Sequence, residues 1–317
     1  MVYVIGEALI DLVMAPAGGP GPTGYLAHPG GSPYNVAIGL ARLGQPARLL
    51  ARLSGDAFGR QLRAHAEANG VDLSCAVDAA EQSTLAVVSL DAERNAEYDF
   101  YRTGTADWQW SDAELDRIPA DASWLHTGSL ASWTEPGAGV IAGQLRRRRQ
   151  RQPVVVSYDP NIRPALLPDH RQALDRVEAM VRLADVVKAS AEDLAWLYPG
   201  RGADEVLRHW RGLGTAVVVM TDGGRGARFL AGQSAADGEV ATVPGRPVEV
   251  VDTVGAGDAF MAGLINALVA GGFAPGAGSA VAPAVAEAVL VAALTCARAG
   301  ANPPTAAELA AARDQRD

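Results

Sequence analysis

Several familiar sequence patterns are absent from this chain of 317 residues. Its two cysteines, Cys75 and Cys296, lie far apart, so they offer neither a disulfide framework nor the spacing of a zinc site, and they favour a reducing, cytoplasmic compartment. The glycine-rich P-loop that ends in Gly-Lys-Ser/Thr does not occur, which excludes a nucleotide site of that kind. A dinucleotide-binding fingerprint is missing too, because residues 6–11 follow the first predicted strand, Val2–Ile5, without the G-x-G-x-x-G spacing.

Basic and membrane-spanning segments are also scarce. The net charge of −9 disfavours a nucleic-acid partner, and the basic run 146–149 is typical of the solvated C-terminal end of a helix. No apolar stretch of membrane length is free of charge and proline, and the closest, 279–299, predicts a buried helix. The first 14 residues lack a basic segment and carry two acidic residues, so they predict a strand and not a signal peptide; we therefore expect no membrane partner.

The rest of the chain has the composition of a globular α/β protein. Apolar residues make up 49% and charged residues 20%. Short β-rich runs alternate with helical patterns, which predicts a mostly parallel sheet with helices on both faces. The predicted strands are 2–5, 47–53, 123–126, 154–158, 185–188 and 216–220, and the predicted helices are 35–43, 57–69, 137–151, 169–183 and 190–198. We expect one domain over residues 1–317, largely helical after residue 250.

Two regions interrupt this alternation. Residues 12–29 are rich in glycine and proline, and residues 85–105 contain two β-rich runs, 85–91 and 96–102, separated by a turn at 92–95. We interpret both regions as a small β-sheet lid inserted in the main domain. The alternative is that they extend the edge of the main sheet.

The sequence Asp-Thr-Val-Gly-Ala-Gly-Asp at 252–258 carries the clearest chemical signal. The helical apolar period that follows Asp258 predicts a tight glycine turn that leads into a helix N-terminus, where backbone N–H groups and the helix dipole favour an anion. Gly255 and Gly257 allow close approach of a ligand, and a carboxylate beside a bound anion can take a proton from a hydroxyl. This arrangement suits phosphoryl transfer. The alternative is a plain turn with Asp258 as a helix cap.

The 252–258 motif resembles the C-terminal signature of the PfkB, or ribokinase-like, carbohydrate kinases. The run Gly-Gly-Ser-Pro-Tyr-Asn-Val-Ala at 30–37 resembles the N-terminal signature of the same family, and the likeness extends from Gly6 to Pro304. It implies a ribokinase-like three-layer α/β/α fold with a β-sheet lid, and an ATP-dependent sugar kinase with Asp258 as the general base. The implied anion hole consists of the amides of Gly255, Ala256, Gly257 and Asp258, and the implied sugar contacts are Asp11, Gly30, Gly31 and Asn35. From position alone, Asn35 is equally suited to cap a helix and Asp11 to end a strand.

The resemblance also implies a nucleotide side. The glycine cluster at 220–226 resembles a family loop that lies along ATP, although such a cluster is often only a hairpin turn. The segment 188–193 resembles one that normally carries Asn-x-x-Glu; here Ser190 and Asp193 take those places, and they also fit a capping box. The ATP contacts implied are Lys188, Ser190, Thr221, Gly223, Gly226 and Asn302; Asp193 would reach Mg²⁺ through water, and Asp252 and the carbonyl of Val254 would hold a monovalent cation such as K⁺. Pro304 stands where ribokinases often have serine, which weakens the cation prediction.

The acceptor is less well defined. The segment 157–164 is similar to the D-x-N-x-R segment of fructokinases and of 2-keto-3-deoxygluconate kinases, and Arg163 and Arg102 suit an anionic group. The overall pattern is most similar to fructokinases, so we expect fructose, with the keto-sugar acid or ribose as alternatives and a non-catalytic sugar-binding protein as a different class. We also expect the lid to close over the sugar and to form a homodimer. Tyr98, Phe100, Trp108 and Trp110 would supply apolar area for the dimer, or else cover the sugar or the core.

Overall fold

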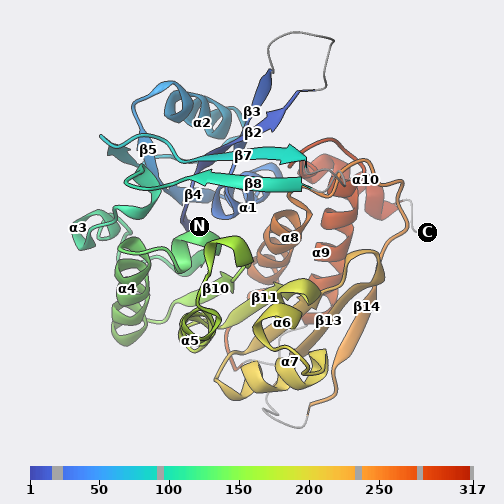
Figure 1. The fold of residues 1–317 in the computed structure, drawn as a ribbon. Coiled ribbons are helices and arrows are strands. Elements are labelled where there is room, and N and C mark those ends of the chain that lie inside the picture. The colour runs from blue at the N-terminus through green and yellow to red at the C-terminus, as the bar shows by residue number, and fades with distance from the viewer. Residues whose placement is uncertain (16–23, 91–95, 233–237, 277–280, 315–317) are drawn as a thin grey trace.

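The structure, a computed structural model, describes residues 1–15, 24–90, 96–232, 238–276 and 281–314. A sheet of eight strands forms its centre (Figure 1). The strands from β12 to β4 in the spatial order are parallel, and β13 and β14 add an antiparallel edge. In spatial order they are β14 (Ala241–Pro244), β13 (Gly226–Ala231), β12 (Val217–Thr221), β11 (Val186–Ser190), β10 (Val155–Asp159), β9 (Trp124–Gly128), β1 (Val2–Ile5) and β4 (Ala47–Leu50).

Helices cover both faces of this sheet, because the strands bury side chains on both sides. Along β1, for example, Val2 and Val4 join one core and Tyr3 and Ile5 the other. The first core includes α1 (Ser32–Arg42), α8 (Ala256–Ala270) and α9 (Val281–Cys296), and the second includes α4 (Gly137–Arg151), α5 (His170–Val181), α6 (Ala191–Leu197) and α7 (Ala203–Gly212). The predicted three-layer α/β/α fold is confirmed.

The remaining elements are short or peripheral. They are α2 (Ala57–Ala68), α3 (Asp112–Leu115), α10 (Ala306–Asp314) and the 3₁₀ turns η1 (Ala106–Trp108), η2 (Ser129–Ser132), η3 (Pro164–Leu166) and η4 (Gly223–Arg225). The basic run 146–149 lies in the last turns of α4, as expected. No helix in the described part of the chain is long and apolar enough to span a bilayer.

The predicted boundaries differ from the observed ones by three residues at two places and by less elsewhere. The predicted strand 47–53 is two strands, since the chain leaves the main sheet after β4 and β5 (Arg52–Ser54) pairs with β6 (Val77–Ala79) in a separate small sheet. The predicted helix 35–43 begins three residues earlier, because Pro33 is well suited to a first helical turn and Gly31 takes the N-cap position. Asn35 therefore lies inside α1, and the alternative that it caps a helix is wrong.

A separate four-stranded sheet lies over one end of the main sheet, at the top of Figure 1. Its spatial order is β3 (Tyr25–Gly30), β2 (Leu9–Met14), β7 (Leu85–Leu90) and β8 (Ala96–Tyr101), and β7 and β8 form the predicted antiparallel hairpin. We call this sheet the lid. The alternative that these segments extend the main sheet is wrong, and Asp11 lies within β2 and not at a strand end. The predicted turn at 92–95 falls outside the described residues.

Candidate active site

The predicted base lies in the first turn of α8. The residue before this helix, Gly255, is in the left-handed region with a φ of 73°, and a Cβ there would lie 2.6 Å from the Cβ of Ala301. Only glycine satisfies both conditions, so the turn that presents Asp258 depends on it. The amide of Ala256 donates to the carbonyl of Thr253 at 3.2 Å. Of the four amides predicted to form an anion hole, only those of Gly255, Gly257 and Asp258 have no acceptor in the described part of the chain.

The carboxylate of Asp258 is held by α1. The hydroxyl of Ser32 donates to Oδ1 at 2.6 Å and the side-chain amide of Asn35 donates to Oδ2 at 2.8 Å. Helices α1 and α8 approach closely enough for this because Gly39 faces Ala262, where a Cβ would lie 2.7 Å from the alanine methyl. The two predicted signatures, more than 200 residues apart, therefore meet at one carboxylate.

Burial sets the protonation behaviour of this carboxyl. Asp258 is 7% exposed, and its desolvation raises its pKa above the ordinary value, while the hydrogen bonds from Ser32 and Asn35 and the charges of Lys188 and Arg163 lower it in part. A carboxyl with a raised pKa is a better proton acceptor than an ordinary aspartate. The environment thus suits a general base better than a simple helix cap.

The predicted sugar contacts lie around the same carboxylate. Asp11 comes from the lid strand β2, and a Cβ on Gly30 would lie 2.2 Å from Oδ2 of Asp11. Burial raises the pKa of Asp11 to about 6, with the charge of Arg163 lowering it and that of Asp258 raising it. Gly31 is the N-cap of α1. Asp11, Gly30, Asn35 and Arg163 are thus linked with each other and with Asp258 by contacts or charge interactions, and Gly31 begins the helix that carries Asn35.

The aromatic residues predicted for the lid behave differently from one another. Trp108 and Trp110 are 2% and 4% exposed and belong to the second core, so their assignment to a dimer surface is wrong, because they lie beyond the lid where the chain has returned to the main body. Phe100 is partly buried and packs against that core. The backbone of Tyr98 lies in β8, but its side chain falls outside the described residues.

The exposed apolar side chains of the lid are others. Val13, Met14, Tyr25, Leu26 and Tyr101 are between 36% and 63% exposed, and all belong to β2, β3 or β8. An apolar group of this kind on one small sheet is typical of a protein–protein contact. The signal that could have found these residues is the apolar composition of the strand ends at 13–14 and 25–26.

On the predicted nucleotide side, the segment 188–193 spans the end of β11 and the start of α6. Ser190 and Asp193 form the capping box that the spacing allows. The hydroxyl of Ser190 accepts from the backbone amide of Asp193 at 3.0 Å, and the carboxylate of Asp193 accepts from the backbone amide of Ser190 at 2.9 Å. The other carboxylate oxygen of Asp193 accepts from the amide of Ile162 at 2.9 Å. Lys188 is 3% exposed and its ammonium lies 2.6 Å from Oδ2 of Asp159. Lys188 is therefore a buried partner of Asp159 and not an exposed lysine.

The glycine cluster forms a hairpin turn between β12 and β13, with Thr221 at the end of one strand and Gly226 at the start of the next. Gly223 and Gly226 both have positive φ, of 49° and 98°. The glycine cluster is thus a hairpin turn, as the alternative interpretation expected. This geometry is compatible with the predicted contact with ATP and does not test it. Asp222 is held by Arg225 within this turn.

Asp252 connects the glycine turn to the loop after α9. Its Oδ1 accepts from the amide of Val254 at 3.0 Å and its Oδ2 from the amide of Gly300 at 2.8 Å. Asn302 lies in the same loop, where its amide donates to the carbonyl of Gly300. The segment predicted to hold a monovalent cation and the loop with the predicted ATP contact Asn302 are therefore joined directly.

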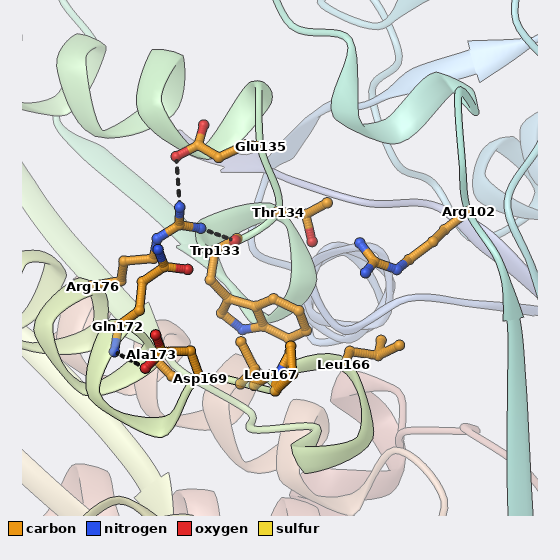
Figure 2. Close-up of a pocket in the computed structure, with 11 residues that line it drawn as sticks. Arg102, Trp133, Thr134, Glu135, Leu166, Leu167, Asp169, Gln172, Ala173 and Arg176 are labelled. Atoms are coloured by element: carbon orange, nitrogen blue, oxygen red, sulfur yellow. Dashed lines mark hydrogen bonds and ion pairs between the residues drawn. The ribbon is translucent and has the colours of Figure 1, made fainter.

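A cavity of about 300 Å³ lies between the end of the lid and α5 (Figure 2). Arg102, which directly follows the lid strand β8, and Thr134 both line it. Arg176, on the far side, is paired with Glu135 and the carbonyl of Trp133. The other lining residues are Leu166, Leu167, Pro168, Asp169, Gln172 and Ala173.

Two residues of the site were not predicted. Ser32 belongs to the 30–37 signature, but its bond to Asp258 could not be inferred without knowing that α1 and α8 touch. Asp159 lies in the 157–164 segment, where its burial at the end of a central strand could have marked it as paired. Ser32 binds Asp258 and Asp159 pairs with Lys188, and both of these partners were predicted from the sequence.

Together, the three-layer fold, the glycine turn at a helix N-terminus and the buried carboxylate define a phosphotransferase that acts on an alcohol group. The chain matches the model of the pfkB family of carbohydrate kinases over residues 1–308, and it belongs to that family. It is 35% identical over 268 residues to a fructokinase of Rhizobium leguminosarum bv. trifolii, an alignment that covers 84% of this chain and 79% of the relative.

Solved structures agree. Fructokinase from Xylella fastidiosa with bound ATP superposes with a TM-score of 0.86 at 28% identity, covering 100% of this chain and 99% of the other. A double mutant of the Vibrio cholerae O395 fructokinase, in a form with fructose, ADP and potassium ion bound, superposes with a TM-score of 0.82 at 29% identity, covering 98% and 97%. The chain is therefore a carbohydrate kinase similar to fructokinases.

Proposed function

We propose that the protein transfers the γ-phosphoryl group of ATP to a hydroxyl of a small monosaccharide, most specifically fructose. The observation that carries this proposal is the Asp258 carboxylate, buried at the start of α8 and held by Ser32 and Asn35. The similarity to fructokinases, one of which is solved with fructose and ADP, supports fructose as the acceptor.

In this proposal Asp258 accepts the proton of the attacking hydroxyl. The amides of Gly255, Gly257 and Asp258, together with the positive end of the helix dipole, bind the charge that develops on the transferring phosphoryl group. The amide of Ala256 contributes less than predicted, because it is bonded to Thr253.

The acceptor would be oriented by groups from both layers. Asp11 and Asn35 offer carboxylate and amide atoms to adjacent sugar hydroxyls, and Gly30 lets the backbone pass close to the Asp11 carboxylate. Phe100 on the lid would cover the sugar when the lid closes, which excludes water from the reaction. Arg102 and Arg163 would hold an anionic substituent or the phosphoryl group.

ATP would lie along the hairpin at Thr221, Gly223 and Gly226, with Ser190 and Asn302 beside it. Mg²⁺ would be held largely by phosphates and water, since Asp193 already accepts amides at both carboxylate oxygens and can reach the ion through water. A monovalent cation would fit between Asp252 and the Val254 carbonyl, where the 252–254 turn meets the 300–302 loop. These ions neutralise phosphate charge when bound.

Two further properties belong to the same proposal. The exposed apolar side chains of the lid support a homodimer formed lid to lid. Gel filtration with light scattering tests it, and a clean monomer at micromolar concentration would refute it. We also expect the enzyme to act in the cytoplasm, where ATP is available.

A panel of acceptors with ATP and Mg²⁺ tests the function. We expect the highest kcat/KM with fructose among fructose, ribose, 2-keto-3-deoxygluconate and nucleosides. A higher value with the keto-sugar acid would favour that second candidate, for which Arg102 and Arg163 are the supporting observation. Asp258→Asn should lose on the order of 10²–10⁴ in kcat while still binding ADP. Turnover at the wild-type rate would refute the base, and ADP and sugar binding without any turnover by the wild type would identify a non-catalytic binding protein.

A further inference from the structure

Lys188 is the only lysine in the chain; all the other cationic side chains among its 27 Lys and Arg residues are arginines. A sequence that otherwise uses arginine throughout has a compact ammonium at this one position, in the middle of the central strand β11. An ammonium is a point charge on a flexible stem, whereas a guanidinium is a broad planar fork.

The ammonium is buried beneath the glycine turn. Lys188 is 3% exposed, and its Nζ lies 2.6 Å from Oδ2 of Asp159, which is fully buried at the end of the neighbouring strand β10. A Cβ on Gly257 would lie 3.2 Å from the same Nζ. The cation therefore touches the first turn of α8 from the side of the sheet, with little room for a larger group.

This position is unfavourable for the helix itself. The N-terminus of α8 carries the positive end of the helix dipole, which repels a cation. Burial alone would lower the pKa of Lys188, but the charge of Asp159, its hydrogen bond, and the charges of Asp193 and Asp258 together raise it. The protein thus maintains a charged ammonium at a place where neither the helix nor solvation favours one.

We propose that Lys188, held in place by Asp159, is a positioning residue for phosphoryl transfer: it adds a fixed positive charge beneath the turn of Gly255, Gly257 and Asp258 and does not contact ATP. This inference rests on the proposed kinase function. A preorganised charge inside a dry site strengthens the binding of the developing phosphoryl charge without any rearrangement during the reaction. Asp159 orients the ammonium toward the turn and prevents it from being a lone buried charge.

The same pair acts on the base, together with the other charged groups around it. The positive charges of Lys188 from β11 and Arg163 from the loop after β10 stabilise the Asp258 carboxylate and lower its pKa, while the negative charges of Asp11 from the lid and Asp159 from β10 have the opposite effect. From α1 the neutral donors Ser32 and Asn35 face it.

Two further groups border the pair. The negative charge of Asp193 from α6 raises the pKa of both Lys188 and Asp159. His126, on the next strand, stays neutral because burial and the charge of Lys188 lower its pKa to about 3. Lys188 lowers the pKa of Asp258 and Asp159 raises it, so substitutions of the two residues should shift this pKa in opposite directions.

Three variants test the inference: Lys188→Met, Asp159→Asn and the double variant. We expect Lys188→Met to lower kcat about 10- to 100-fold, less than the 10²–10³ typical of a lost direct donor, with the KM for ATP unchanged. Its acid limb of kcat against pH should move to higher pH, because Asp258 loses a neighbouring cation. Asp159→Asn should move the limb to lower pH, because Asp258 loses a neighbouring anion.

The double variant separates positioning from structural support. Because an uncharged pair has no lone buried charge, this variant should fold with a Tm close to that of the wild type, and its acid limb should return toward the wild-type pH. Its kcat should stay low, since the turn still lacks the ammonium. Recovery of kcat in the double variant would show that the pair only neutralises itself. A higher KM for ATP with unchanged kcat in Lys188→Met would make Lys188 a nucleotide ligand, and either result would overturn the proposal.

A second ion pair, at the other end of β11, offers a matched control. Arg149 pairs with Asp185 at 2.6 Å, and Asp185 directly precedes β11 at the opposite end of the strand from the glycine turn. Arg149→Met breaks an ion pair of similar length, and we expect it to leave kcat and the acid limb unchanged. A change as large as that of Lys188→Met would indicate a general effect on the fold and refute the specific role.

One measurement does not depend on turnover. Protein labelled with ¹⁵N-lysine should show a single side-chain ammonium signal, because Lys188 is the only lysine. Saturation with ADP plus inorganic phosphate should shift this signal, and in Asp258→Asn, which is inactive if the base is right, the shift should persist. An unchanged signal would refute the inference whatever the activity, whereas a shift in a protein that phosphorylates none of the sugars tested would refute only the proposed function.

Discussion

The hydrogen bond from Ser32 to Asp258 offers the most direct test of how this site works. The bond is 2.6 Å long, its acceptor is a carboxylate, and both residues are buried, with exposures of 6% and 7%. Hydrogen bonds to charged groups contribute about 1.5–3 kcal/mol. Since this bond stabilises the charged form, its loss in Ser32→Ala should raise the pKa of Asp258 further.

The direction of the effect follows from linkage. Burial raises the folded-state pKa of Asp258 above its unfolded value, so its protonated form favours folding and that contribution is lost as the pH rises through the folded pKa. Ser32→Ala raises this pKa further. The variant should therefore lose stability relative to the wild type mainly above that pH, where the carboxylate is charged, and little below it.

The assay is kcat/KM against pH, with the Tm measured over the same range. We expect the acid limb of Ser32→Ala to move to higher pH while the activity at high pH recovers most of its wild-type value. Ser132→Ala is the matched control, because this serine is 5% exposed and donates at 2.7 Å to the carbonyl of Ser129 instead of to a carboxylate. If the limb of Ser32→Ala stays in place, or if Ser132→Ala moves it equally, the hydrogen bond does not set the pKa of the base.

Three further predictions follow from single contacts. Gly255→Ala should lower kcat by at least about 10-fold, since the new methyl meets Ala301 and the turn cannot keep its left-handed φ; wild-type kinetics would contradict this. Asp252→Asn should raise the KM for ATP and the K⁺ concentration needed for half-maximal activity, because it weakens the bond to Gly300, and unchanged values would refute the link. Trp108→Ala should lower the free energy of unfolding in urea by about 3–5 kcal/mol without changing the oligomeric state, because Trp108 is buried in the core. Leu26→Asp should dissociate a dimer at little cost in stability, because Leu26 is exposed on the lid. The opposite pattern would show that Trp108 lies in the dimer interface and Leu26 in the core.

Much of the fold could be predicted because its signals are local. Each central strand is a short apolar run followed by a helical period, and the five predicted parallel strands after the first all occur within three residues of their predicted ends. The helix start just before Asp258 was equally visible, since a glycine turn before an apolar helix has few other interpretations. The strand predicted at 47–53 was too long because apolar composition does not reveal that the chain changes sheets at Ala51.

The contacts between distant elements could not be predicted in the same way. The aromatic composition near residue 108 suited an interface as well as a core, and only the return of the chain to the main body buries Trp108. The lid could be an edge extension until the pairing of β2 with β3 and β7 excluded it.

By itself, the sequence determined that this protein has a layered α/β fold and a carboxylate at a helix N-terminus, because patterning and turn chemistry act over a few neighbouring residues. Only the tertiary structure decided which groups hold that carboxylate and how they tune it. Ser32 and Asn35 meet Asp258 across more than 220 residues, and Lys188 joins Asp159 beneath it, because the packing of α1, α8 and the central strands removes water from all of them at once. Burial strengthens each of these interactions, and burial is a property of the assembled fold.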